Sequence, residues 1–410
     1  MMFYRYQDLC LCDRGGGLPE GAAAVEAPFA PLIFTVRRDP LCSRGLYRID
    51  RMSQLEEAET PALLQADAPA PADPLDAFLQ THGAAVLNTS FARCWDVLQA
   101  TLHPKRDHFR VHLVGLGDVG GTVLLGLKLL GREIDRIGIY DPNEAVCQRY
   151  RLELNQVLPE RDSDAVPTVE VLAPEQLFDC DALLFTASLG VPAVGSQVAD
   201  VRMVQYHRNR ELLKDYARMA REQQFTGLFC QISDPVDHLC RAVFLASNRD
   251  GQGVFDAAGL LPEQIQGYGL GVMRARAGFY AGERGVDFSK GCAFGPHGKQ
   301  LIVANAAGAD YDHALSLQLT RDTVTANLKV RDLGFKPYLA PGLSSAAISV
   351  LRTLRGEYHD GAMALGGIYF GCRLRSTALG VQPERTALHP RLLERMQEVY
   401  DALRGFDYDG

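Results

Sequence analysis

The stretch that most constrains the fold of this chain runs from Phe109 to Asp141. A short apolar segment leads into three glycines at positions 115, 117 and 120, after which apolar residues recur at helical spacing. A second apolar segment follows and ends in Asp141, 21 positions after the last of these glycines. Strand, tight turn, helix, second strand and terminal acid therefore occur in the order that predicts a dinucleotide-binding βαβ unit.

Each glycine of this motif has a physical role in such a unit. Gly115 allows the sharp turn out of the strand, Gly117 lets the backbone approach a pyrophosphate, and Gly120 lets the helix pack closely on the sheet. The helix N-terminus offers unpaired N–H groups to the phosphates. Asp141 would accept hydrogen bonds from the adenosine ribose, and no arginine directly follows it, so NAD is favoured over NADP. A structural glycine-rich turn is the alternative, but it does not explain the ordered set.

Composition excludes several other classes of protein. The chain has 410 residues, of which 47% are hydrophobic and 22% charged, and this length favours more than one domain. A net charge of −8 argues against a nucleic-acid binder, and no apolar run reaches the roughly 20 residues of a membrane span. The N-terminus lacks the pattern of a secretory signal, so a cytoplasmic protein is expected. The ten cysteines are scattered, so we expect reduced thiols and no metal site.

Residues 1–108 precede the βαβ unit and are expected to form a separate N-terminal α+β domain of unknown role. Strands are predicted over 3–12, 31–36 and 45–52, an Ala/Pro linker over 66–74, and one helix over 75–102. The simplest interpretation of the arginines in this segment is a solvated strand face, although an interface is also possible. These arginines are Arg37, Arg38, Arg44, Arg48 and Arg51.

Further strands and helices alternate after Asp141, as in an α/β protein with a parallel sheet. The continuous apolar segment 182–187 predicts a strand buried on both faces, and it leads into a loop that begins at Ser188. A second buried strand over 227–232 is followed by Ser233-Asp234-Pro235-Val236-Asp237. Loops at the carboxyl ends of parallel strands are where doubly wound sheets bind ligands.

Several motifs in one order resemble those of the lactate and malate dehydrogenase family. They are GLGDVGG, the acid-ended second strand, FTASLGVP, Arg202 seven positions before Asn209, ISDPVD, GYGLGVMRARAG and FGPHG. The resemblance extends from about Phe109 to about Leu403. It implies a Rossmann-type doubly wound parallel sheet in a dinucleotide-binding domain at 109–250 and an α+β substrate domain at 251–410.

The resemblance also implies roles for individual residues. His297 matches the histidine that transfers the proton, Arg276 matches the arginine that binds the substrate carboxylate, and Arg202 matches the loop arginine that polarises the carbonyl. Ser344 falls where the family has a small hydroxyl residue in the pocket. The expected partners are a small carboxylate substrate, NAD and further copies of the chain in a dimer or tetramer. Expected cofactor contacts are Gly115, Gly117, Asp118, Val119, Gly120, Asp141, Thr186, Ala187 and Ser188.

Two positions depart from the family pattern. Met273 stands where the family has the aspartate that orients the histidine, and Asp234 stands where it has an asparagine. The leading hypothesis is an NAD-dependent oxidoreductase acting on a 2-hydroxy or 2-oxo acid, with Asp234 close to His297 and stabilising the imidazolium in place of the lost aspartate. The alternatives are a non-catalytic dinucleotide-binding sensor or scaffold, and an enzyme of related chemistry on an unusual acid.

Overall fold

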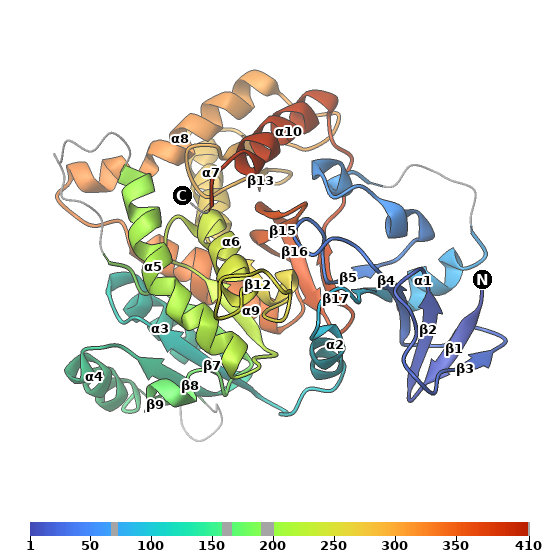
Figure 1. The fold of residues 1–410 in the computed structure, drawn as a ribbon. Coiled ribbons are helices and arrows are strands. Elements are labelled where there is room, and N and C mark those ends of the chain that lie inside the picture. The colour runs from blue at the N-terminus through green and yellow to red at the C-terminus, as the bar shows by residue number, and fades with distance from the viewer. Residues whose placement is uncertain (67–72, 158–165, 190–200, 409–410) are drawn as a thin grey trace.

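One twisted 15-stranded sheet extends from the N-terminal strands at one edge to β9 at the other (Figure 1). This computed structural model describes residues 1–66, 73–157, 166–189 and 201–408, without the side chains of 201–203. Within these residues the strand order is β3-β1-β2-β4-β6-β5-β17-β16-β15-β12-β11-β10-β7-β8-β9. The Ala/Pro linker predicted over 66–74 lies largely outside the described residues.

Six neighbouring strands of the sheet run parallel to one another. They are β7 (Phe109–Val114), β8 (Ile134–Tyr140), β9 (Thr168–Val171), β10 (Ala182–Phe185), β11 (Leu228–Gln231) and β12 (Ile265–Gly267). Their order β9-β8-β7-β10-β11-β12 corresponds to 3-2-1-4-5-6, with neighbouring strands parallel throughout. This is the Rossmann order, in which the chain reverses direction across the sheet between the first and fourth strands.

Helices cover both faces of these six strands, as a doubly wound sheet requires. α3 (Asp118–Leu130), α4 (Glu144–Leu154) and α9 (Ile348–Leu354) pack through one apolar cluster. α5 (Val201–Glu222) and α6 (Val236–Ser247) pack through another on the opposite face. Short 3-10 helices η3 (Pro174–Gln176) and η4 (Pro262–Gln264) precede β10 and β12. The predicted Rossmann-type α/β fold is confirmed.

The C-terminal half adds antiparallel strands and long helices. β15 (His359–Leu365), β16 (Ile368–Thr377) and β17 (Gly380–Pro383) continue the large sheet beside β12, and β13 (Cys292–Phe294) and β14 (Ile302–Ala304) form a separate hairpin. The helical elements are α7 (Leu270–Glu283), α8 (His313–Asp332), the π-helical turn η5 (Pro341–Ala347) and α10 (Pro390–Arg404). None of the described helices is both long and apolar enough to cross a bilayer.

The N-terminal segment forms its own run of strands at the other end of the sheet. Its elements are β1 (Phe3–Tyr6), β2 (Leu9–Asp13), β3 (Ala23–Val25), β4 (Leu32–Val36), β5 (Leu46–Ile49), η1 (Met52–Glu56), η2 (Pro61–Leu64), α1 (Asp76–His82), β6 (Ala84–Asn88) and α2 (Cys94–Leu102). The single helix predicted over 75–102 is wrong. Gly83, with a φ of 71°, ends α1, and the five buried residues 84–88 form a strand between β4 and β5. A continuous apolar run of this length suits a strand that is buried on both faces.

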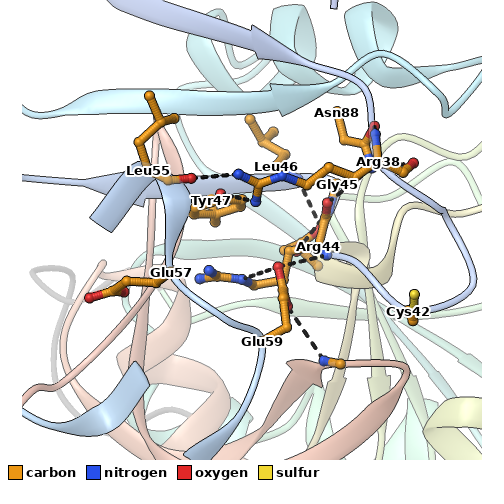
Figure 2. A network of polar contacts seen from close by, with 12 residues as sticks. Arg38, Cys42, Arg44, Gly45, Leu46, Tyr47, Leu55, Glu57, Glu59 and Asn88 are labelled. Atoms are coloured by element: carbon orange, nitrogen blue, oxygen red, sulfur yellow. Dashed lines mark hydrogen bonds and ion pairs between the residues drawn. The ribbon is translucent and has the colours of Figure 1, made fainter. Parts of the chain in front are cut away.

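A buried ion pair within the N-terminal segment lies at the junction with the C-terminal half (Figure 2). Arg44 is 4% exposed, lies over the ring of Tyr47, and its Nε is 3.1 Å from Oε1 of Glu59. The backbone carbonyl of Glu59 in turn accepts a hydrogen bond from the hydroxyl of Tyr400 in α10. The predicted solvated arginine face is therefore wrong for Arg44, because its position in the tertiary structure places it inside this junction.

We expect Arg44→Ala to destabilise the protein by about 3–5 kcal/mol, because the substitution leaves the largely buried carboxylate of Glu59 without its cation. Urea unfolding would measure the loss. Arg136→Ala is the matched control, since Arg136 is half exposed in its ion pair with Glu170 and should contribute about 1 kcal/mol or less. Equal losses in the two variants would contradict the anchoring role of Arg44.

Candidate active site

The glycine turn after β7 is shaped by close packing at two of its three motif positions. Gly115 has a φ of +93°, and a Cβ placed there would lie 2.6 Å from the backbone nitrogen of Ala187. A Cβ at Gly120 would lie 2.0 Å from the carbonyl oxygen of Gly115. By contrast, a Cβ at Gly117 would meet nothing within 4 Å. The turn thus leaves open space at the N-terminus of α3, where a pyrophosphate group would fit.

Asp141 lies beside this turn at the carboxyl end of β8. Its two carboxylate oxygens accept hydrogen bonds from the backbone N–H groups of Leu116, at 2.8 Å, and Asn143, at 2.9 Å. Thr186, which follows β10, donates its hydroxyl to the carbonyl oxygen of Gly115 at 2.6 Å. Asp118 forms an exposed ion pair with Lys336 at 2.9 Å. The carboxyl ends of β7, β8 and β10 therefore meet, and the residues present fit an adenine dinucleotide.

His297 lies in a turn that follows β13 and is fixed through its backbone. Its N–H donates to Oδ2 of Asp237 at 2.8 Å, while the N–H of Gly295 donates to the carbonyl of Gly371 in β16 at 2.9 Å. Gly295 has a φ of +78°, which favours glycine. The His297 side chain is 15% exposed, so the imidazole is largely enclosed but open to one side.

Two carboxylates flank this histidine. Oδ1 of Asp234 is 3.3 Å from Nδ1 of His297, close enough for an ion pair, although the angles do not satisfy a hydrogen bond. Asp237 is 4% exposed, and burial raises its pKa to about 6. The structure therefore brings Asp234 to the histidine, as predicted, and adds Asp237, which sequence analysis had placed in the motif without assigning it a role.

Arg276 and Met273 lie on neighbouring turns of α7. Burial lowers the pKa of Arg276, and its Nη1 lies 3.8 Å from the sulfur of Met273. Among the described residues, no carboxylate is within ion-pair distance of Arg276, so its guanidinium is available to an anionic ligand. Met273 is 4% exposed and belongs to an apolar cluster formed by α7, β13 and β14. At position 273, where the family has an aspartate, this chain has a methionine that packs among apolar side chains.

Asn209 and Gly269 position the groups around the histidine. Asn209 is fully buried in α5, accepts the N–H of Leu189 at 3.0 Å and donates to the carbonyl of Asp234 at 2.7 Å. It thereby ties the loop after β10 to the turn after β11. A Cβ at Gly269 would lie 2.5 Å from Nδ1 of His297, so only glycine leaves room for the imidazole. The motifs contained both residues, but spacing alone did not reveal these contacts.

The remaining predicted substrate residues are not placed at the histidine. The side chain of Arg202 lies outside the described residues. Ser344 is in η5 and lines a different cavity of about 520 Å³ together with Arg274 and Arg352. The part of the chain that the structure describes contains no group of three or more His, Cys, Asp or Glu side chains arranged to hold a metal ion.

Comparisons with known proteins agree with the fold described above. No protein-family model matches the chain. The L-lactate dehydrogenase of Treponema denticola is 27% identical over 286 residues, which cover 61% of this chain and 82% of that enzyme. The malate dehydrogenase of Sulfurimonas denitrificans is 26% identical over 176 residues, 40% of this chain and 52% of that enzyme. The chain is a divergent relative of the lactate and malate dehydrogenases.

Solved structures of this family show the same fold. The minor L-lactate dehydrogenase of Enterococcus mundtii, solved in a ligand-bound form, gives a TM-score of 0.59 at 17% identity, covering 73% of this chain and 97% of that one. The malate dehydrogenase of Archaeoglobus fulgidus, solved in complex with NADH, gives a TM-score of 0.59 at 18% identity. The match covers 72% of this chain and 97% of that one. At these identities the structural likeness shows the fold alone. The relatives identified by sequence, a lactate and a malate dehydrogenase, are oxidoreductases.

We expect the buried carboxyl group of Asp237 to make the free energy of unfolding depend on pH. Because burial raises its pKa from 3.8 to about 6, the folded state binds a proton more tightly than the unfolded state. Stability is therefore lost as pH rises from about 4 to about 6, by on the order of 3 kcal/mol. Asp237→Asn keeps an acceptor for the His297 N–H and should remove this part of the pH dependence.

Urea unfolding of both proteins at about pH 4 and pH 7 would measure this difference. The control is Asp215→Asn, because the side chain of Asp215 is 75% exposed. If Asp237→Asn retains the full pH dependence of the parent, the assigned burial effect is wrong.

Proposed function

We propose that the protein is an NAD-dependent oxidoreductase that transfers a hydride between nicotinamide and a 2-hydroxy or 2-oxo acid. The observation that carries this proposal is the approach of His297, Asp234 and Asp237 at the carboxyl ends of the parallel strands. Through Asn209 this cluster is connected to the loop after β10, which also contacts the glycine turn. An acid/base group thus lies next to a dinucleotide fold.

The proposed roles follow from the chemistry of each side chain. His297 gives a proton to the carbonyl oxygen of a 2-oxo acid, or takes one from the hydroxyl of a 2-hydroxy acid, because imidazole titrates near neutrality. Arg276 binds the substrate carboxylate through its planar guanidinium. Arg202 is proposed to close over the substrate, whereas Ser344 receives no role because it lines the separate cavity with Arg274 and Arg352. When bound, nicotinamide supplies or accepts the hydride.

Steady-state turnover of NADH with a panel of 2-oxo acids tests this function. Activity that is lost in His297→Asn, with folding retained, supports the proposal. Binding of NADH without turnover of any acid would instead support the second candidate, a dinucleotide-binding sensor or scaffold. The replacement of the family's acid by the apolar Met273 is the observation that favours this second candidate.

We expect tighter binding of NADH than of NADPH. The 2′-phosphate of NADPH would lie beside the carboxylate of Asp141, which two backbone N–H groups already orient, and the two negative charges would repel each other. Asp141→Ala should reduce the difference between the NADH and NADPH affinities. Asp135→Asn, at an exposed position on the same strand, should leave that difference unchanged. Fluorescence titration with both reduced nucleotides measures the affinities. Equal or tighter NADPH binding by the parent protein would refute the prediction.

Asp234 is proposed to perform the electrostatic duty that the family assigns to the aspartate missing at position 273. Its carboxylate is 3.3 Å from the imidazole, and a negative charge at that distance stabilises the imidazolium needed to protonate a 2-oxo acid. Asp234 also acts on Arg276, where its charge opposes the effect of burial. The competing interpretation is that Asp234 repels an anionic substrate.

We expect Asp234→Asn to slow reduction of a 2-oxo acid by roughly tenfold or more, because the imidazolium loses the neighbouring negative charge. Met273→Asp should restore part of the rate in the Asp234→Asn background, because it returns an acid to the histidine. Rates measured from pH 5 to pH 9 for the single and double variants test both statements. A rate that is unchanged or faster in Asp234→Asn would show that the carboxylate hinders the reaction.

A homodimer or tetramer is also proposed. The outer surface of α3, helices of the C-terminal half and the segment between α8 and η5 expose large apolar side chains, and a contiguous exposed apolar patch marks an interaction surface. These residues are Leu125, Leu129, Phe279, Leu328, Leu333, Phe335, Leu339 and Ile348. We expect light scattering at micromolar concentration to give at least twice the 45.0 kDa chain mass, and Phe335→Glu to reduce it. A monomeric parent protein would contradict the proposal.

A further inference from the structure

A second cavity lies at the end of the sheet opposite the candidate active site. It has a volume of about 730 Å³, within the range of small-molecule sites. Its floor is formed where β7, β10, β11 and β12 begin, and its other walls come from α2, from Leu46 at the start of β5, and from the turn between β16 and β17. Ligands of doubly wound sheets normally bind at the carboxyl ends of the strands, so this cavity is distinct from the dinucleotide site.

The walls of the cavity are largely apolar. Leu46, Val97, Phe178, Phe225 and Leu261 all line it, and each is no more than 6% exposed. Phe178 and Phe225 form an edge-to-face pair with ring centres 5.2 Å apart. These side chains form an apolar wall large enough for an aromatic or branched aliphatic group.

One carboxylate in this lining has no cationic partner. Glu263 is 9% exposed and accepts hydrogen bonds from the backbone N–H groups of Gly45 and Leu46 at 2.9 and 3.0 Å. Within the described residues, no Lys, Arg or His side chain lies within ion-pair distance of it. Arg44, the cation whose charge acts on Glu263, is paired with Glu59.

The other acids of the lining are neutralised. Asp179 and Asp181 both pair with Arg106, at 2.8 and 3.2 Å, and Arg355 pairs with Glu133 at 2.8 Å. A buried carboxylate without a counter-ion is costly, and a cation that enters the cavity would supply the missing charge-assisted hydrogen bond. Lys105, Arg106 and Arg355 also line the cavity, but the apolar wall beside the carboxylate of Glu263 suits a ligand that is apolar at one end and positively charged at the other.

We propose that this cavity binds a small organic ammonium ion with an aromatic or branched aliphatic body, whose charged group pairs with Glu263. The N-terminal segment supplies α2, Leu46 and the N–H groups that hold Glu263, while the dinucleotide-binding half supplies the apolar floor. Such a ligand therefore contacts both parts of the chain. The site is independent of the proposed dehydrogenase activity, since none of the residues proposed for that activity lines it.

The first experiment uses calorimetry on the full-length protein with phenethylamine, isoamylamine and tryptamine at up to millimolar concentration. Each amine is compared with a neutral or acidic analogue of the same body, 2-phenylethanol and phenylacetate for phenethylamine. We expect saturable one-to-one binding of at least one amine and at least about tenfold weaker binding of its analogues. Absence of binding by all three amines, or equal binding of the neutral analogue, overturns the proposal.

Two variants then locate the site. Glu263→Gln keeps an acceptor for the Gly45 and Leu46 N–H groups and should weaken amine binding at least tenfold, whereas the exposed Glu175→Gln should not. Ala100→Phe fills the cavity from α2 and should abolish binding, whereas Ala92→Phe, at an exposed position just before α2, should not. If Glu263→Gln does not fold, Ala100→Phe still decides the location. Unchanged binding in folded Glu263→Gln or Ala100→Phe overturns the assignment.

Discussion

The hydrogen bond from the backbone of His297 to the buried carboxylate of Asp237 is the contact on which the candidate site depends. It joins a turn of the C-terminal half to the start of α6 in the dinucleotide-binding half, across 60 positions of sequence. The imidazole is thereby held next to Asp234, which stands only three residues before Asp237. Asn209 extends the same arrangement to the loop after β10. The histidine therefore lies beside the carboxyl ends of the parallel strands, which these contacts fix to one another.

Two departures of this chain from the family pattern concern the acids expected around the same histidine. An acid is absent at Met273, which packs with the apolar residues of α7, β13 and β14, and another acid is present at Asp234. The two changes are electrostatically complementary, since each alters the charge near the imidazole in the opposite sense. They also differ in environment, because Met273 is buried while the side chain of Asp234 is 51% exposed. An ionised carboxylate therefore has a smaller desolvation penalty at position 234 than it would have at position 273.

The N-terminal segment is attached to the rest of the chain by buried charges as well as by strands. Only one residue pair, Val381 with Tyr47, joins β17 to β5 in the sheet. The hydrogen bonds from Gly45 and Leu46 to Glu263, and from Tyr400 to the carbonyl of Glu59, reinforce this narrow connection. The Arg44–Glu59 ion pair holds Glu59 in place for this contact. Specific polar contacts of this kind fix one relative position of the two parts, whereas apolar contact alone would tolerate several.

The sequence by itself determined the dinucleotide-binding fold and the family, because a glycine that needs positive φ, a buried parallel strand and an acid at a strand end are local requirements that local residue types satisfy. Its apolar spacing predicted α3. The order of its motifs carried the family resemblance, which implied that Asp234 lies close to His297. The sequence did not determine β6, which was taken for helix because the apolar run 84–87 suits either state until β4 and β5 pair with it. Nor did it determine the burial of Arg44, the contact of Gly269 with the imidazole, or the unpaired carboxylate of Glu263. Each of these depends on residues far apart in the chain, and only the tertiary structure decided which of them meet.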